Sequence, residues 1–224
     1  MAEEDKNITV RPSGPYLVRG NIPLVRKSQI MSEYGQPLDR KKDERVIDAD
    51  DTYRLCRCGQ SKAKPFCDGT HTIVEFNGDE AADTEPVAAR AATRRSAKIN
   101  IQDEHSICVH SGFCGTRLTN VWEMRKDSGD PEVLAQIIKM IDNCPSGALA
   151  YSLEEGGEII EPELAKEIVV IPDGPLWVSG GIPVTRRDGK PMETRNRVTL
   201  CPCGASAMKP LCDGTHKELG FTDS

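Results

Sequence analysis

The chain has 224 residues, of which 38% are hydrophobic, 4% aromatic and 29% charged, and its formal net charge is −6. Few large side chains are available for one extensive core, so small domains held by a metal or by disulfides are expected. The acidic balance gives no reason to expect a nucleic acid partner. No apolar run reaches the ~18 residues of a membrane helix, so we expect no membrane association.

The cysteines favour metal chemistry over a disulfide framework. Nine are present, an odd number, and the acidic start Met-Ala-Glu-Glu-Asp is not followed by the apolar region of a secretory signal. We therefore expect a cytoplasmic protein. In that reducing compartment, clustered cysteines usually serve metal or redox chemistry.

A sequence repeat occupies the two ends of the chain. Residues 13–24 (SGPYLVRGNIPL) align without a gap with residues 173–184 (DGPLWVSGGIPV). Short β-type runs at 16–18 and 176–178, bounded by Gly and Pro, predict strands. The first copy has 15 extra residues before its cysteines, within a polar stretch over 29–51 that we interpret as an enlarged loop.

Each copy ends in a motif with the spacing C-x-C-x8-C-x3-H. The candidate ligands are Cys56, Cys58, Cys67 and His71 in the first motif, and Cys201, Cys203, Cys212 and His216 in the second. The last cysteine and the histidine are four residues apart, which places both on one face of a helical turn. Asp68 stands where an N-cap would satisfy the first amides of that turn.

Two kinds of metal site suit such a motif. Four Cys and His ligands can hold structural zinc, but a zinc knuckle usually begins with C-x2-C rather than C-x-C. A two-iron cluster divides its ligands into two pairs, naturally Cys56 with Cys58 and Cys67 with His71. The spacing favours the two-iron cluster and leaves zinc as the alternative.

The motifs resemble those of the CDGSH iron–sulfur family. Both copies end in Cys-Asp-Gly-Thr-His, with a Ser three positions after the second Cys and a Pro two before the third. Thr70 and Thr215 replace the Ser of the family name. The resemblance implies a [2Fe–2S] cluster held by three Cys and one His in a small β-rich module. It also implies that two modules pair, here within one chain.

The histidine ligand predicts the character of each site. Replacing a thiolate by an imidazole raises the reduction potential of a cluster. The ring nitrogen that does not bind iron can take up a proton, and the added negative charge of a reduced cluster favours that proton. We therefore expect reduction to be coupled to protonation at His71 and His216.

A different segment lies between the repeats. After a predicted linker over 78–98, the chain reads Cys108-Val-His110-Ser111-Gly-Phe-Cys114 and, much later, Cys144-Pro. Bacterial ferredoxins use C-x2-C-x2-C and a distant Cys-Pro, and Ser111 occupies the middle position of that triplet. Asp130-Pro131 predicts the start of a helix. Its apolar stripe consists of Val133, Ile137, Ile138 and Ile141, and a strand is predicted over 148–151.

This middle segment resembles the divergent single-cluster ferredoxin domains. With Cys108, Cys114 and Cys144 as ligands, a [3Fe–4S] cluster is the simplest expectation. A [4Fe–4S] cluster would need Ser111, His110 or a ligand from outside the segment. The alternative is a ferredoxin-like module that has lost its cluster and keeps three reduced thiols.

The predicted fold class is α+β. Two small β-rich CDGSH modules, residues 8–77 and 167–224, form an intrachain pseudo-dimer, and a ferredoxin-like α+β module over 99–166 is inserted between them. We call these three parts the first repeat, the second repeat and the middle segment.

The predicted function is one-electron transfer by a monomer that is not an enzyme, with a redox partner protein or a flavin reductase. No catalytic triad, phosphate loop or nucleotide fingerprint is present. Cluster donation, cluster storage or redox sensing is the alternative, because an iron held by histidine is easier to release. A structural zinc protein is the second alternative.

Overall fold

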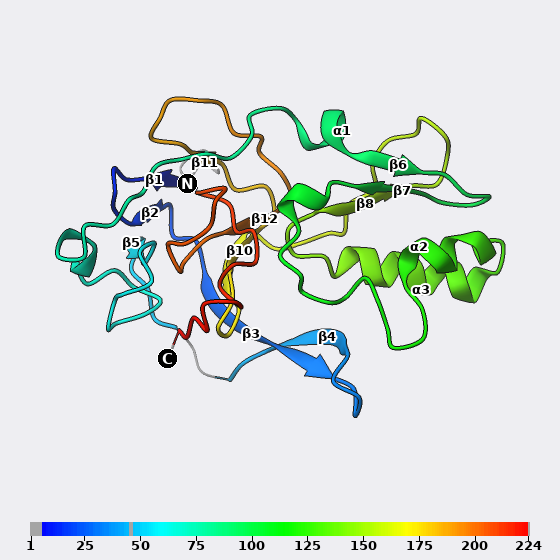
Figure 1. Cartoon of the computed structure of the whole chain (residues 1–224), viewed down its shortest axis with the longest axis horizontal. Coiled ribbons are helices and arrows are strands. Elements are labelled where there is room, and N and C mark those ends of the chain that lie inside the picture. The colour runs from blue at the N-terminus through cyan, green and yellow to red at the C-terminus, as the bar shows by residue number, and fades with distance from the viewer. Residues whose placement is uncertain (1–5, 45–46, 224) are drawn as a thin grey trace.

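The computed structural model describes residues 6–44 and 47–223 and belongs to the α+β class, with more strand than helix (Figure 1). The acidic residues 1–5, on which the expectation about a secretory signal depends, lie outside the described residues. None of the helices in the described part of the chain is long and apolar enough to cross a membrane.

The two repeats exchange strands. The first repeat contains β1 (Asn7–Val10), β2 (Tyr16–Arg19), β3 (Leu24–Met31), β4 (Pro37–Lys42) and β5 (Thr52–Leu55). The second contains β9 (Glu167–Val170), β10 (Leu176–Ser179), β11 (Val184–Thr185) and β12 (Arg197–Leu200). The sheet orders are β11-β1-β2-β5 and β12-β10-β9-β3-β4. The first sheet therefore includes β11 of the second repeat, and the second sheet includes β3 and β4 of the first repeat. Strands β2 and β10 confirm the predicted strands.

Parallel pairing holds the exchanged strands in place. Ile8 of β1 is the register partner of Val184 in β11. Leu24 of β3 is the partner of Ile168 in β9. Because both pairings are parallel, a short hairpin turn could not make them, and they depend on the whole chain folding back on itself.

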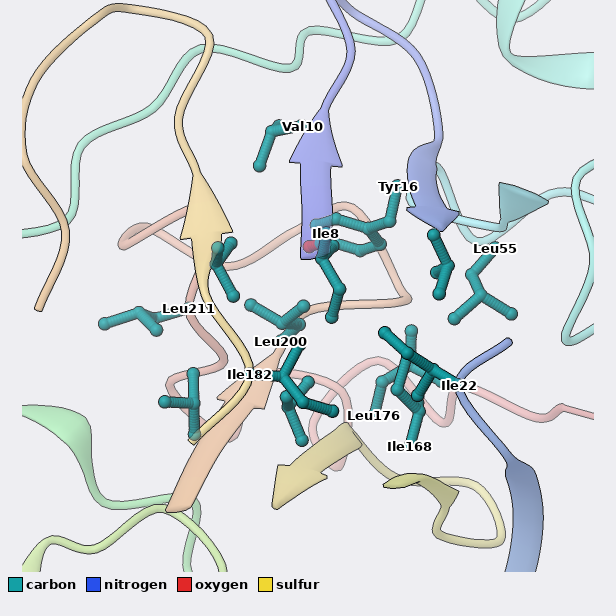
Figure 2. Close-up of a cluster of buried hydrophobic side chains, with 14 of the residues drawn as sticks. Ile8, Val10, Tyr16, Ile22, Leu55, Ile168, Leu176, Ile182, Leu200 and Leu211 are labelled. Atoms are coloured by element: carbon teal, nitrogen blue, oxygen red, sulfur yellow. The ribbon is translucent and has the colours of Figure 1, made fainter. Parts of the chain in front are cut away.

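One hydrophobic core lies between the repeats (Figure 2). Its buried members include Ile8, Tyr16, Ile22 and Leu55 of the first repeat and Ile168, Leu176, Ile182 and Leu200 of the second. Complete burial of one such aliphatic side chain stabilises the fold by about 1.5–3 kcal/mol. The repeats share this core, so neither buries its apolar strand face alone.

The stretch interpreted as an enlarged loop is largely a β-hairpin, and that interpretation was wrong. Strands β3 and β4 pair from Lys27 with Lys42 to Met31 with Pro37, with a bulge beside Met31. The alternation of apolar and polar residues is weak here because long basic side chains cover apolar surface with their stems. Arg40, for example, packs over the Trp177 ring of the second repeat, with its guanidinium carbon 4.8 Å from the ring centroid.

The middle segment forms its own sheet and helices at the end of the molecule away from β1, β2 and β5 (Figure 1). The antiparallel sheet has the order β6 (Ala92–Arg94), β7 (Asn100–Asp103) and β8 (Leu149–Ser152), and the helices are α2 (Val121–Met124) and α3 (Pro131–Asp142). The Asp130 carboxylate accepts a 2.8 Å hydrogen bond from the Glu132 amide and caps α3 as predicted.

Helix α3 and the predicted linker each differ from the prediction in one detail. In α3, Ile137, Met140 and Ile141 are the buried residues, while Val133 and Ile138 of the predicted stripe are half-buried. The predicted linker is not featureless: it carries α1 (Val87–Arg90), and its strand β6 forms the edge of the middle sheet.

Candidate iron–sulfur sites

Each motif brings its four ligands together as two close pairs. In the first repeat, Cys56 Sγ lies 3.9 Å from Cys58 Sγ, and Cys67 Sγ lies 3.3 Å from His71 Nδ1. In the second, Cys201 Sγ lies 3.5 Å from Cys203 Sγ, and Cys212 Sγ lies 3.3 Å from His216 Nδ1. Two ligands of one tetrahedral metal, bound at about 2.3 Å to sulfur and about 2.0 Å to nitrogen, stand about 3.5–3.8 Å apart. Each observed separation therefore lies within about 0.3 Å of the value for two ligands on one metal.

The pairs do not merge into one single-ion site. Within residues 6–44 and 47–223, no three Cys, His, Asp or Glu side chains converge as ligands of one ion. Burial raises the pKa of Cys58 to about 11, and the charges of the Cys56 and Cys67 thiolates add to the rise. Two metals with two protein ligands each would need further bridging ligands. The donor set fits a two-iron, two-sulfide cluster.

A small network of hydrogen bonds shapes each motif loop. The Ser61 hydroxyl donates to the Phe66 carbonyl oxygen at 2.6 Å, and the Asp68 carboxylate accepts from the amides of Lys62 at 2.8 Å and Thr70 at 3.0 Å. Hydrogen bonds from the Thr70 side chain and from these amides hold the pKa of Asp68 well below its usual value. The predicted N-cap role of Asp68 was wrong: the short helical turn is Thr70–Thr72, Gly69 with a φ of 90° is its N-cap, and Cys67 lies outside the turn. The Asp68 carboxylate instead ties the eight-residue loop to the turn that carries His71.

The second motif repeats this network. The Ser206 hydroxyl donates to the Leu211 carbonyl oxygen at 2.7 Å, and Asp213 accepts from the amides of Ala207 and Thr215. The Thr215 hydroxyl also donates to the Asp213 carboxylate at 2.7 Å. A hydroxyl at this position is therefore used directly, and Thr supplies it as Ser would.

The two motifs differ in exposure. All four ligands of the second motif are buried, with His216 only 3% exposed. In the first motif Cys67 and His71 are half-buried and line an open groove beside Arg11 and Arg54. The first site therefore faces solvent on its histidine side, and the second is enclosed.

The middle segment supplies part of the enclosure of the second motif. Val109, which follows Cys108, is buried in one cluster with Cys201, Cys203 and Cys212. A Cβ atom on Gly214 would stand 2.9 Å from the His110 ring, and the Lys217 ammonium donates to the His110 carbonyl oxygen. The chain from Cys108 to His110 therefore joins the middle segment to the second motif.

The three remaining cysteines line one cavity. It has a volume of about 260 Å³, and its lining includes Cys108, Cys114 and Cys144. Burial raises the pKa of the Cys114 thiol to about 11, and the thiols of Cys108 and Cys144 add to the rise. The cavity is far larger than one ion, and its thiol lining fits an iron–sulfur cluster.

The residues considered for a fourth ligand lie at the same cavity. Ser111 and His110 both line it, and the His110 Nδ1 lies 4.0 Å from the Cys108 Sγ. His105 lines it too, and sequence reasoning missed that residue because it lies outside the spacing of ferredoxin cysteines. Its place in a short helical turn directly after β7 could have drawn attention to it.

Sequence reasoning also missed three arginines that surround the Cys144 loop. Arg197 donates to the Cys144 carbonyl oxygen at 3.1 Å, and Arg195 donates to the Ser146 carbonyl oxygen at 2.9 Å. Arg40 donates to the Asn143 carbonyl oxygen at 2.8 Å. They come from both repeats, and no local pattern in the sequence connects them with the middle segment.

Comparison with known proteins finds two families on this chain. The family described as "Iron-binding zinc finger CDGSH type" matches residues 13–72 and 173–217. The family described as "Divergent 4Fe-4S mono-cluster" matches residues 95–154.

Curated relatives match a shorter part of the chain. The uncharacterized protein YjdI of Escherichia coli K12 and its counterpart in strain O157:H7 are each 39% identical over 57 residues, which cover 24% of this chain and 75% of the relative. No solved structure matches the chain significantly. The chain belongs to the CDGSH-type iron–sulfur proteins, with two CDGSH segments that flank a divergent 4Fe-4S segment.

Proposed function

We propose that this protein is a one-electron carrier with two [2Fe–2S] clusters, one on each motif. The proposal rests on one observation. Each set of four ligands divides into two pairs, and the distance between the two ligand atoms of a pair is close to that expected for two ligands on one tetrahedral metal. A single zinc would need a third ligand in one group, and the described residues contain no such group. When bound, each cluster takes up and gives back one electron.

The residues of each motif have distinct roles in this proposal. Cys56 and Cys58 would hold one metal, and Cys67 with His71 would hold the other. Amides that point at the thiolates stabilise their negative charge. The Gly214 amide, for example, donates to the Cys212 Sγ at 3.5 Å. Such hydrogen bonds to sulfur tune the reduction potential of a cluster. The proton coupling expected at His71 and His216 stays a prediction.

We propose a third cluster in the cavity of the middle segment, with Cys108, Cys114 and Cys144 as ligands. The match to the divergent 4Fe-4S family supports a [4Fe–4S] cluster, and the three thiols alone would suit a [3Fe–4S] cluster. The fourth position would then belong to one of the polar residues at the cavity. The His110 Nδ1 atom lies 4.0 Å from the Cys108 Sγ, and the Ser146 hydroxyl, which also lines the cavity, lies 3.7 Å from the Cys144 Sγ.

We also propose that the repeats act as an intrachain pseudo-dimer, with the module boundaries predicted above. The reciprocal strand exchange and the shared core support it. A cytoplasmic location and a partner such as a flavin reductase or another redox protein belong to the same proposal. The half-buried ligands Cys67 and His71 offer a place where such a partner can approach a cluster.

One observation favours a second function. Because His71 faces an open groove, the first site could release its iron to an acceptor, as a cluster donor or redox sensor would. The two functions make opposite predictions about the fate of the iron. An electron carrier keeps its clusters through many redox cycles, and a donor loses them.

The experiment cycles anaerobically purified protein between dithionite and ferricyanide in the presence of an apo-ferredoxin. The proposal predicts a reversible visible spectrum and no colour in the acceptor. Transfer of the cluster during cycling would support the donor function instead. His71→Cys is the matched variant: an all-cysteine first site should have a lower reduction potential, while the second site keeps its own.

A further inference from the structure

The β3–β4 hairpin lies against both cysteine-bearing loops of the middle segment. On the first loop, the Gln29 side-chain amide donates to the Ser111 carbonyl oxygen at 3.1 Å. A Cβ atom on Gly112 would stand 3.1 Å from the Pro37 ring. These contacts place the hairpin over the turn between Cys108 and Cys114.

Arg40 of β4 reaches the second loop. Its guanidinium donates to the Asn143 carbonyl oxygen at 2.8 Å and lies 3.4 Å from the Asn143 side-chain oxygen, directly before Cys144. The guanidinium carbon is 4.1 Å from the centroid of the Phe113 ring, next to Cys114. One side chain thus contacts residues adjacent to two of the three middle cysteines.

The charge of Arg40 lacks a close counter-ion. Among the residues that the structure describes, no carboxylate lies within 4.0 Å of its guanidinium nitrogens, and its Nε is buried without a partner. The neighbouring Asp39 is engaged by Lys139 at 3.4 Å. Burial lowers the pKa of Arg40 to about 10, and the Cys144 thiolate and Asp39 act against that shift, so the group is a cation at neutral pH. A cation withdrawn from water in this way is costly unless an anion faces it.

We propose that the β3–β4 hairpin holds the two cysteine-bearing loops of the middle iron–sulfur site together and that the positive charge of Arg40 stabilises the anionic cluster there. The inference rests on the third cluster proposed above. It gives a function to the 15 extra residues of the first repeat, because this hairpin contacts both cysteine-bearing loops of the middle segment. Arg195 and Arg197 assist from the second repeat through the loop carbonyls, and Arg197 is already neutralised by Glu161 at 2.7 Å.

The test compares Arg40→Leu, Arg40→Lys and the control Lys139→Met by EPR-monitored redox titration of the intact protein. Lys139 carries the same charge at the same interface, but its side chain is 63% exposed. Removing a cation stabilises the oxidised, less negative cluster. Arg40→Leu should therefore lower the potential of the middle cluster, with a shift of roughly tenfold or more in its reduction equilibrium. Arg40→Lys should recover most of that shift, and Lys139→Met should have little effect.

The two CDGSH clusters in the same sample serve as the internal control. Their potentials should stay unchanged in every variant, which separates a local charge effect from a loss of fold. An unchanged middle potential in Arg40→Leu would overturn the inference, as would a shift of all three potentials together. A wild-type protein with iron on both motifs and none on the middle cysteines would also overturn it and would leave the electron carrier of two clusters standing.

Discussion

Gly59 of the first motif lies directly against Cys203 of the second. A Cβ atom on Gly59 would stand 2.5 Å from the Cys203 carbonyl oxygen, and one on Gly204 would stand 2.9 Å from the Cys58 carbonyl oxygen. Both glycines have left-handed backbone angles, with φ of 77° and 82°. The two C-x-C loops are therefore packed back to back, and this contact leaves no room for a side chain at either glycine.

Gly59→Ala should separate the two motif loops. The added methyl group would meet the Cys203 backbone, and overpacking of this kind destabilises a fold by about 1–3 kcal/mol. Gly35→Ala is the matched control, because Gly35 has a similar φ of 74° but nothing within 4 Å of its Cβ position. Chemical unfolding should show a larger loss for Gly59→Ala than for Gly35→Ala. Equal losses would mean that only the backbone angle matters and that the loops do not press on each other.

Tyr16 belongs to the first repeat, but Tyr16→Phe should weaken the binding of iron at the second site. The Tyr16 hydroxyl donates to the Cys201 carbonyl oxygen at 2.8 Å and lies 3.0 Å from the Pro210 carbonyl oxygen. Loss of such a buried hydrogen bond lowers the free energy of unfolding by about 0.5–1.5 kcal/mol. Iron should also leave the second site faster, as measured by its visible absorbance. If only the first site responded, the bond across the repeats would have no role in holding the second.

A chelator should remove the iron in two phases. Cys67 and His71 are half-buried and border an open groove, whereas His216 is 3% exposed beneath Val109 and His110. The first site should therefore lose its cluster first, and the visible spectrum should fall to about half of the [2Fe–2S] signal before the slower phase. His71→Ala should abolish the fast phase and leave the slow one. A single phase for both sites would contradict the difference in burial.

The middle and second sites should interact magnetically when both are reduced. Val109 packs on Cys201, Cys203 and Cys212 one residue after Cys108, so the two sites are joined by a short stretch of chain. Spin relaxation of the second cluster should slow when Cys114→Ser removes the middle cluster. The first cluster should change much less. An equal change at both motifs would place the middle cluster elsewhere.

The local features of the sites were predictable from sequence, because they depend on short spacings. The pairing of Cys67 with His71, the capped start of α3 at Asp130 and the core strands β2 and β10 all follow from patterns within a few residues. The ligand sets and module boundaries stay predictions.

The relationships across the chain were not predictable in the same way. The polar residues over 29–51 predict a loop, but most of this stretch belongs to the β3–β4 hairpin, whose strand character depends on pairing with β9 and on packing against Trp177. Similarly, Arg40 and Arg197 reach the Cys144 loop only after the chain has folded back. A sequence window holds no signal for such contacts, since the partners are about 100 and 50 residues away.

Iron and acid-labile sulfide per chain, measured with the visible spectrum of anaerobically purified protein, test the central claim most directly. Two [2Fe–2S] clusters predict about four iron and four sulfide with a [2Fe–2S] spectrum, and an occupied middle site raises the iron to about seven or eight. Cys56→Ser and Cys201→Ser should each remove about two iron. Zinc in a colourless protein without sulfide would contradict the claim.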